Sequence, residues 1–182
     1  MSRIHKINAF VIKRINYSEA DKILTVYSLE NGKQTLIAKG IRRIKSRRAG
    51  SLELFSQVKI VYYQGRSMGI VTETELVQPN HLLSQNYLTT LVAYQMIELI
   101  DKLTLEDQLH PELYYLLEKA LNYLQLAHLD QHNFSKVMIR FRIRILEELG
   151  FGVPENPDLA SLTRHIESIL EKELIVPKML PI

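Results

Sequence analysis

The spacing of apolar residues changes near residue 78, and this change constrains the fold more than any other feature of the sequence. Before it, short runs rich in β-branched and aromatic residues alternate with turn residues, which is typical of strands. After it, apolar residues recur every three or four positions, which is typical of helices. We therefore expect an α+β protein with an all-β domain over residues 1–79 and an α-helical domain over residues 80–182.

The first domain is expected to contain five strands. Asn31-Gly32 favours a tight hairpin between the second and third strands, and the turn at 64–69 makes the fourth and fifth antiparallel. The third and fourth strands are joined by the one long connection, which has room for a helical segment. This layout predicts an OB-fold, a five-stranded Greek-key barrel, with an SH3-like barrel as the alternative. The expected strands are 7–15, 22–29, 33–40, 54–63 and 69–77.

The second domain is expected to be a helical bundle. An apolar stripe over residues 83–100 predicts its first helix, and Pro111 suits the first turn of the next. A third helix covers 134–149 and ends at a glycine. Asn156-Pro157 is expected to open a fourth, whose apolar residues also recur at helical spacing.

Six cations lie in the stretch "KGIRRIKSRRAG", residues 39–50, with no acidic neighbour. The first 80 residues hold 14 Lys/Arg against 6 Asp/Glu, whereas the remainder holds 9 against 14. We expect this basic half to bind the phosphates of nucleic acid without reading base sequence, although a solvated loop would have the same composition. The candidate residues are Lys39, Arg42, Arg43, Lys45, Arg47 and Arg48 in the run, with Lys13, Arg14 and Lys33 elsewhere in the domain.

Aromatic side chains in the same half are candidates for stacking on bases. Some of them must fill the barrel core instead. Strand alternation makes Tyr62 and Tyr63 face opposite ways, so at most one of that pair can present its ring on the outer surface. The five candidates are Tyr17, Tyr27, Phe55, Tyr62 and Tyr63.

The sequence carries no catalytic signature. Cysteine is absent, and there is no Gly-rich phosphate loop, G-x-S-x-G elbow or H-E-x-x-H motif. We therefore expect a protein that is not an enzyme and needs no cofactor. His128, Asp130 and His132 in "HLDQH" are expected to be solvated loop residues and not a metal site. The first residues resemble neither a signal peptide nor a membrane span, so we expect a cytoplasmic, nucleoid-associated protein.

Two segments together resemble one family. The stretch "NYSEADKILTVYSLENGKQTLIAKGIRRIKSR" (16–47) closely resembles the N-terminal part of the bacterial RecO proteins, which are recombination mediators of DNA repair. The segment "RFRIRILEELGFGV" (140–153) is similar to part of that family's helical domain. The matching positions of the first stretch are Tyr17, Glu19, Asp21, Lys22, Gly32, Lys39, Gly40, Arg42, Arg43 and Ser46.

This resemblance implies an OB-fold followed by a helical domain, which agrees with the pattern of apolar residues. It implies binding of single- and double-stranded DNA and annealing of complementary strands, without nucleotide hydrolysis. It also implies that, with RecR, the protein helps to load RecA onto strands coated by single-stranded-DNA-binding protein. Glu19 and Asp21 fit the family pattern but lie in the basic half. We expect them to order the turn between the first two strands by accepting backbone hydrogen bonds or pairing with a cation.

The resemblance further implies that the helices receive the acidic C-terminal tail of single-stranded-DNA-binding protein. Lys136, Arg140 and Arg144 are four residues apart and share one face of the expected third helix. An apolar stripe that includes Phe141 adjoins them, and Arg140 and Phe141 match the family segment. These four residues are the candidate partner site. Pairing of the cations with Glu147, Glu148 or other helices is the alternative.

The chain also departs from the family pattern. Many RecO proteins carry a four-cysteine zinc module after the segment corresponding to Gly150, and this chain has no cysteine to bind zinc in that way. Its C-terminal part is also shorter than the family leads us to expect, which bears on the contact with RecR. Two other functions fit the basic barrel: an OB-fold module for RNA or ribosomes, and a scaffold that binds an acidic protein.

Overall fold

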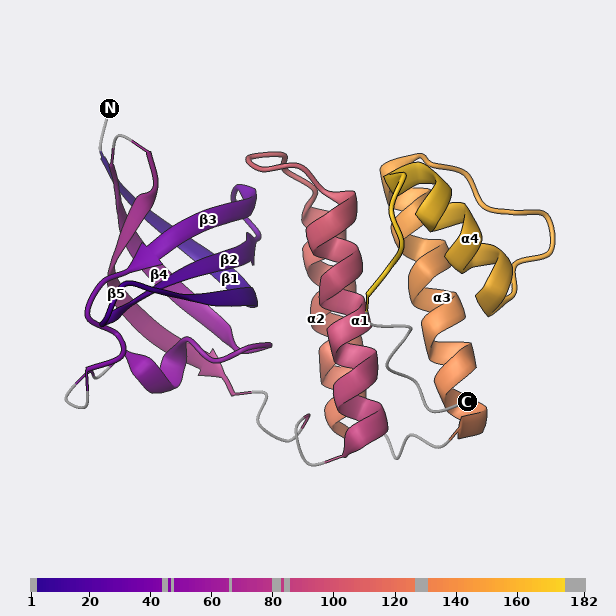
Figure 1. The fold of residues 1–182 in the computed structure, drawn as a ribbon, viewed down its shortest axis with the longest axis horizontal. Coiled ribbons are helices and arrows are strands. Elements are labelled where there is room, and N and C mark those ends of the chain that lie inside the picture. The colour runs from indigo at the N-terminus through magenta and orange to yellow at the C-terminus, as the bar shows by residue number, and fades with distance from the viewer. Residues whose placement is uncertain are drawn as a thin grey trace. The chain divides into compact units, whose positions relative to one another are not determined.

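A computed structural model gives the fold of the 182-residue chain (Figure 1). It describes residues 3–43, 46, 48–65, 67–79, 83, 86–126 and 131–175. The elements are β1 (Ile4–Tyr17), β2 (Asp21–Ser28), β3 (Gly32–Ala38), a 3-10 turn η1 (Ala49–Ser51), β4 (Gln57–Gln64), β5 (Gly69–Gln78), α1 (Tyr87–Leu103), α2 (Pro111–Leu126), α3 (Gln131–Leu149) and α4 (Leu159–Leu170).

The chain forms two compact units. One contains Met1–His81 together with Thr104–Tyr114, and the other contains Leu82–Leu103 with Tyr115–Ile182. The first unit is the barrel and the second holds most of the helical residues. No pattern in the sequence signals that a segment between two helices belongs with the barrel.

The five strands close into a barrel in the order β1-β2-β3-β5-β4. The predicted hairpins β2–β3 and β4–β5 are antiparallel, and β1 pairs antiparallel with both β2 and β4. β3 and β5 run parallel and pair only at Leu36–Gly69 and Ile37–Ile70. The predicted OB-fold barrel is therefore confirmed.

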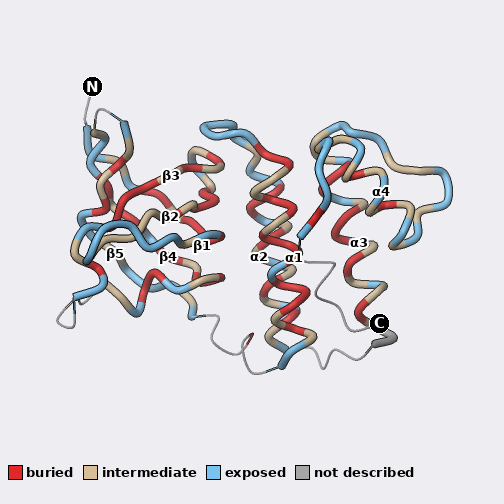
Figure 2. Tube along the Cα trace, viewed as in Figure 1, coloured by how far each residue is buried: buried red, intermediate tan, exposed pale blue. Residues whose placement is uncertain are grey.

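Alternate strand residues point into the barrel and form its core, because successive side chains of a strand face opposite sides. Where β3 approaches β5, Gly69 leaves room for its neighbours, since a Cβ atom there would lie 2.6 Å from the Tyr62 ring and 2.7 Å from Leu36. Figure 2 shows the buried stretches along the strands. The core consists of Ile7, Ala9, Val11, Leu24, Val26, Leu36, Ala38, Ile41, Leu52, Val58, Ile60, Tyr62 and Val71.

Several strand boundaries differ from the prediction, and two of the differences change a connection between strands. The β2–β3 loop has three residues instead of two, because Ser28 pairs with Gly32, whose φ of +70° suits glycine. The fourth strand begins at Gln57 and not at residue 54. Phe55 has a φ of +67°, and its amide donates to the carbonyl of Val11 at 2.9 Å, so this part of the chain turns before the strand starts.

The segment Thr104–Tyr114 covers part of the outer surface of the barrel. The amide of Asp107 donates to the carbonyl of Lys33 at 2.9 Å. The rings of Phe10 and Tyr114 pack with centroids 5.2 Å apart. The close fit continues at the β2–β3 loop, where a Cβ atom on Gly32 would lie 1.8 Å from a carbonyl oxygen of the segment.

The second unit confirms the predicted helices. α3 ends at Leu149, before Gly150 with its φ of +72°, as expected. α4 is capped by Asp158, whose carboxylate accepts from the Ser161 amide at 2.6 Å, so the cap lies just beyond the predicted Asn156-Pro157. This hydrogen bond holds the pKa of Asp158 below its usual range. In the described part of the chain, no helix has the length and apolarity needed to cross a membrane.

A buried arginine links three helices of this unit. Arg142 on α3 is only 1% exposed, and it donates to Gln95 Oε1 on α1 at 3.3 Å. It also donates to the Leu159 carbonyl at 3.1 Å and to the Thr163 hydroxyl, both on α4. Burial lowers the pKa of Arg142 to about 10. The sequence analysis did not single out this residue.

Candidate functional site

The long connection between β3 and β4 closes one end of the barrel. Leu52 and Phe55 within it are buried, and η1 supplies its only helical turn among the described residues. Glu53 forms an ion pair with Arg14 of β1 at 2.6 Å. The later half of the connection is therefore packed against the barrel, and the basic run lies in its earlier half. We call residues 39–48 the basic loop.

The start of the basic loop is held by the β1–β2 turn. Asp21 Oδ1 accepts from the Gly40 amide at 2.7 Å, and the Arg42 amide donates to the Ala20 carbonyl at 2.9 Å. Gly40 has a φ of +66°, which favours glycine. Asp21 thus accepts a backbone hydrogen bond as predicted, but the segment that it orders is the start of the basic loop and not the β1–β2 turn.

The end of the basic loop is held by Arg48. Its Nη1 donates to the Val71 carbonyl at 2.7 Å, and its Nη2 donates to the Lys39 carbonyl at 2.9 Å. Because the β3–β5 ladder pairs only two residues of each strand, these carbonyls lie beyond it. Arg48 therefore links the two strands where their backbones no longer pair, and its guanidinium is occupied by the protein.

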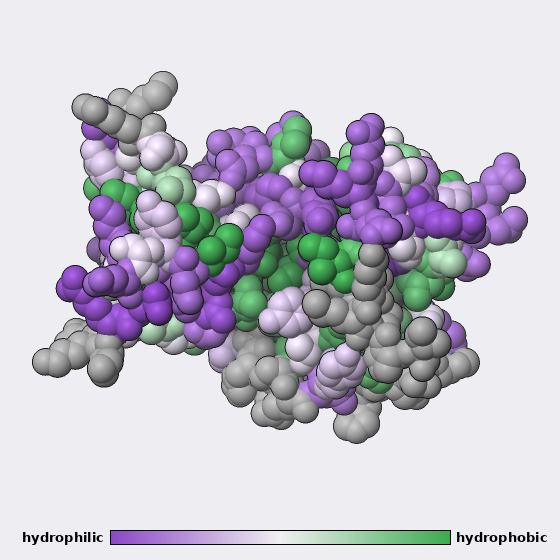
Figure 3. Space-filling view, in the orientation of Figure 1, coloured by the Kyte–Doolittle hydropathy of each residue, from purple (hydrophilic) through white to green (hydrophobic). Residues whose placement is uncertain are grey.

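Three cations of the basic loop face solvent. Lys39, Arg42 and Arg43 are exposed. Arg42 Nη1 donates to the Ser18 carbonyl at 3.1 Å, which orients the guanidinium without neutralising it. The side chains of Lys39 and Arg43 have no hydrogen-bond or ion-pair partner within the described ranges. In Figure 3, hydrophilic side chains gather at the end of the barrel where the chain leaves β3.

The other predicted cations have different surroundings. Lys45 and Arg47 lie outside the described residues. Lys13 is exposed on β1, whereas Arg14 is occupied by its ion pair with Glu53. Lys33 lies at the start of β3, next to Glu106, whereas the basic loop follows the other end of that strand. The structure thus brings Lys39, Arg42 and Arg43 together and separates Lys33 from them.

The five aromatic side chains predicted as candidates for base stacking differ in their exposure. Tyr27, Phe55 and Tyr62 are buried, whereas Tyr17 and Tyr63 are exposed. Tyr62 and Tyr63 face opposite ways, as predicted. Burial raises the pKa of Tyr27, whose hydroxyl donates to the carbonyl of His110 at 3.3 Å.

A pocket of about 470 Å³ lies between α2 and α3 in the helical unit. All four predicted partner-site residues line it: Lys136, Arg140, Phe141 and Arg144. From α2 come residues that the sequence analysis missed, among them Lys119 and Tyr123. Their four-residue spacing on α2 was the available signal, since it places both on one helix face.

The pocket combines cations with an apolar floor. Arg144 is partly compensated, with Nη1 at 3.1 Å from Glu147 and Nη2 at 3.8 Å from Glu148, as the alternative interpretation expected. Arg140 is exposed and has no ion-pair or hydrogen-bond partner among the residues that the structure describes. Phe141 is buried at the base. None of the lining residues that the structure describes is acidic. The site therefore suits an acidic segment that also carries an apolar side chain.

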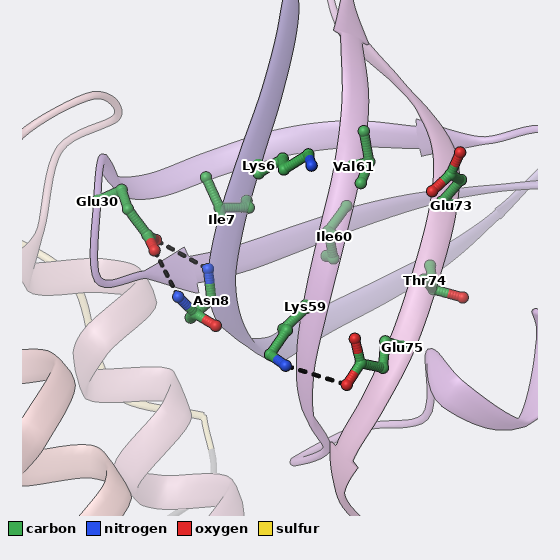
Figure 4. Close-up of a pocket in the computed structure, with 10 residues that line it drawn as sticks. All are labelled: Lys6, Ile7, Asn8, Glu30, Lys59, Ile60, Val61, Glu73, Thr74 and Glu75. Carbon is green, nitrogen blue, oxygen red and sulfur yellow. Dashed lines mark hydrogen bonds and ion pairs between the residues drawn. The ribbon is translucent and has the colours of Figure 1, made fainter.

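A second hollow, of about 420 Å³, lies on β1, β4 and β5 of the barrel (Figure 4). Some of its charged groups are paired or hydrogen-bonded within the hollow. Glu30 accepts from the side chain of Asn8 at 2.6 Å, and Lys59 pairs with Glu75 at 3.0 Å. This mixed lining has no excess of positive charge, so we assign no phosphate site to it.

The histidine pair stays a prediction. His128 and Asp130 lie outside the described residues, as does the side chain of His132. α2 ends at Leu126 and α3 begins at Gln131, which agrees with a connection between two helices at this point. Among the described residues, no group of three or more His, Asp or Glu side chains is arranged to hold a metal ion.

Comparison with known proteins identifies the family. The family model for the Recombination protein O N terminal matches residues 1–80, and that for the Recombination protein O C terminal matches residues 84–163. Curated relatives called DNA repair protein RecO are similar over most of the chain. That of Listeria monocytogenes is 33% identical over 81% of this chain, and that of Symbiobacterium thermophilum is 30% identical over 87%.

The matched region is only part of each relative. It covers 56% of the Listeria protein, 60% of the Symbiobacterium protein and 52% of a 28% identical relative from Desulfitobacterium hafniense. The chain thus spans little more than half the length of these relatives. Two adjoining family models nevertheless account for most of its residues. The chain belongs to the RecO family of DNA repair proteins.

Proposed function

We propose that this protein is a recombination mediator that binds single- and double-stranded DNA and anneals complementary strands. It helps to load RecA onto strands coated by single-stranded-DNA-binding protein, in concert with RecR. It acts by binding and not by catalysis. The observation that carries the proposal is the basic loop, which is held at both ends while Lys39, Arg42 and Arg43 stay exposed.

The arrangement of the loop suits a sequence-independent phosphate contact. Holding both ends reduces the conformational entropy that the loop loses on binding. Exposed cations release counterions from DNA when they neutralise phosphates, and this contribution does not depend on the bases. Arg48 is a positioning residue in this proposal, because its guanidinium is already bound to backbone carbonyls.

The α2–α3 pocket is the proposed docking site for the acidic C-terminal tail of single-stranded-DNA-binding protein. Its cations complement an acidic segment, and Phe141 with its apolar neighbours can receive an apolar tip. Arg140 is central to this proposal because its guanidinium has no partner in the described part of the chain. The pocket would bring coated strands to the protein, while the basic loop binds the DNA itself.

Annealing of bare and coated strands by the Arg140→Glu variant tests the two roles separately. The substitution places a negative charge where the acidic tail would bind. We expect it to abolish binding of the tail peptide and annealing of coated strands, while annealing of bare strands is largely retained. Both rates can be followed by fluorescence of end-labelled complementary strands, and peptide binding by anisotropy.

Lys172→Glu is the matched control, because it reverses an exposed charge in the same unit outside the pocket lining. It should leave both annealing reactions and peptide binding close to those of the wild type. Equal loss of both reactions in folded Arg140→Glu, or unchanged peptide affinity, would place the partner site elsewhere. Tighter binding to single-stranded RNA than to DNA, without annealing, would favour an RNA-binding module instead.

A further inference from the structure

The outer face of β1, β2 and β3 is divided into a covered half and an open half. The segment Thr104–Tyr114 packs on the covered half, where Phe10 and Tyr27 are buried. The open half lies nearer to the basic loop, because it includes the end of β1 and the end of β3. Polar side chains would be the ordinary choice for such an exposed strand surface.

A bulge in β1 sets which side chains reach this open half. Up to Val11 the odd-numbered residues point into the core, but the register shifts between Val11 and Lys13. After the shift, Arg14 pairs with the inward-facing Leu24. Lys13 and its alternate neighbours therefore face outward, since residues paired across two strands share a face. These neighbours are Ile15 and Tyr17.

The open half is apolar at its centre. Ile15 is 51% exposed and Tyr17 is 49% exposed. Ile15 pairs with Ile23 on β2, which in turn pairs with Ile37 on β3, so a row of isoleucines crosses the three strands. Ile23 is half-buried and Ile37 is buried, so the exposed apolar surface is centred on Ile15 and Tyr17, at the β1 end of this row.

This apolar row adjoins the cations of the basic loop. Tyr17 pairs with Asp21, which holds the Gly40 amide, and the next residue, Ser18, accepts from Arg42. The exposed ring and the exposed guanidinium are thus attached to the same turn. A ring platform beside cations is the combination that single-stranded nucleic acid requires, with bases on the rings and phosphates on the cations.

We propose that Tyr17, supported by Ile15, stacks on an unpaired base and gives the protein a preference for single-stranded over duplex DNA. This inference rests on the proposed DNA binding by the basic loop. In duplex DNA the faces of the bases are already stacked on one another, so only an unpaired base can use this surface. Tyr63, the other exposed ring among the five candidates, is less suited because its hydroxyl is held by Arg3 at 2.9 Å and it lies on β4.

A single tryptophan at position 17 tests the contact directly. The chain contains no tryptophan, so Tyr17→Trp introduces a lone fluorophore at the proposed site. Binding of oligo(dT) should quench its fluorescence. An abasic oligomer of equal length, which carries the phosphates without the bases, should leave the fluorescence unchanged even when it is bound. Tyr115→Trp on α2 is the control, and it should respond to neither oligomer.

Affinity measurements provide the second test. Tyr17→Ala should weaken binding of oligo(dT) about tenfold, as expected for the loss of one stacked base, and leave binding of duplex and abasic DNA unchanged. Tyr17→Phe should retain the wild-type affinity, because the ring is kept. Binding of oligo(dT) to the Tyr17→Trp variant without quenching of its fluorescence, or unchanged affinity of Tyr17→Ala for oligo(dT), would overturn the inference.

DNA binding by the basic loop and base stacking by Tyr17 are refuted by different results. If the wild type binds duplex and single-stranded DNA equally and Tyr17→Ala does the same, only the stacking role is refuted. If the wild type binds none of the three probes, the proposed DNA binding fails and the stacking role fails with it. A Tyr17→Ala variant that loses affinity for all three probes to the same extent would also refute stacking.

Discussion

Replacement of Arg42 and Arg43 by alanine should change the salt dependence of DNA binding by a definite amount. Each phosphate contact on a single strand contributes about −0.7 to the slope of log K against log[salt]. If about four contacts form, the wild-type slope is near −3, and loss of two should bring it to about −1.5. Loss of two contacts changes the slope by about 1.4. Over the one decade between 1 M and 0.1 M salt, this change corresponds to about a 25-fold loss of affinity at 0.1 M.

Fluorescence anisotropy of a labelled oligo(dT), measured at salt concentrations between about 50 and 200 mM, would give the slopes of the wild type and of the double variant. Lys33→Ala is the matched control, since Lys33 lies at the start of β3 beside Glu106, away from the basic loop. This control should lower the net charge without changing the slope. Thermal melts should show that the variants remain folded, because the side chains of Arg42 and Arg43 are exposed.

The slope separates phosphate contacts from indirect effects. Weaker binding with an unchanged slope would mean that Arg42 and Arg43 support the fold of the site and do not neutralise phosphates. An unchanged slope with unchanged affinity would refute the assignment of the basic loop altogether. A slope change in Lys33→Ala as large as in the double variant would show that only overall charge matters.

Two further substitutions test contacts within the barrel unit and within the helical unit. Asp21→Ala removes the acceptor of the Gly40 amide and should destabilise the protein by about 1.5–3 kcal/mol, with a smaller effect on DNA affinity of the folded fraction. Asp21→Asn, which keeps an acceptor, should lose less in a thermal melt, and the reverse order would contradict the contact. Arg142→Ala should cost about 3 kcal/mol in urea unfolding, because it leaves a cavity and an unpaired Gln95. Arg142→Met fills that volume and should cost clearly less, so equal losses would refute the packing argument.

Much of the fold could be predicted from the spacing of apolar residues, because each strand and helix buries one face and therefore repeats apolar residues at its own period. The hairpins β2–β3 and β4–β5 could be predicted because each needs only a short turn, whereas the sequence left an SH3-like barrel as the alternative to the OB-fold. The segment Thr104–Tyr114 could not be predicted, because its contacts depend on backbone groups such as the carbonyls of Lys33 and His110, which every residue possesses. The three-residue β2–β3 loop was missed for a related reason. Asn31-Gly32 locates a turn, but the pairing of Ser28 with Gly32 fixes its length.

The α3 side of the candidate pocket was predictable because it depends on one helix. Lys136, Arg140 and Arg144 share a face through their spacing alone, and an apolar stripe beside them implies a floor. The residues from α2 required knowledge of which helix packs beside α3. Such pairings between helices are set by the whole unit and not by local spacing, so Lys119 and Tyr123 were not identified.

The basic loop shows why a count of cations overestimates phosphate contacts. Arg42 and Arg48 carry the same side chain in the same run, yet only Arg42 is left exposed. The difference arises because the β3–β5 ladder stops after two residues and leaves carbonyls that need donors, which Arg48 supplies. That ladder depends on the register of two strands that are far apart in the sequence, and no local pattern encodes it. Counting charges therefore gives an upper limit on contacts, and the salt slope gives their number.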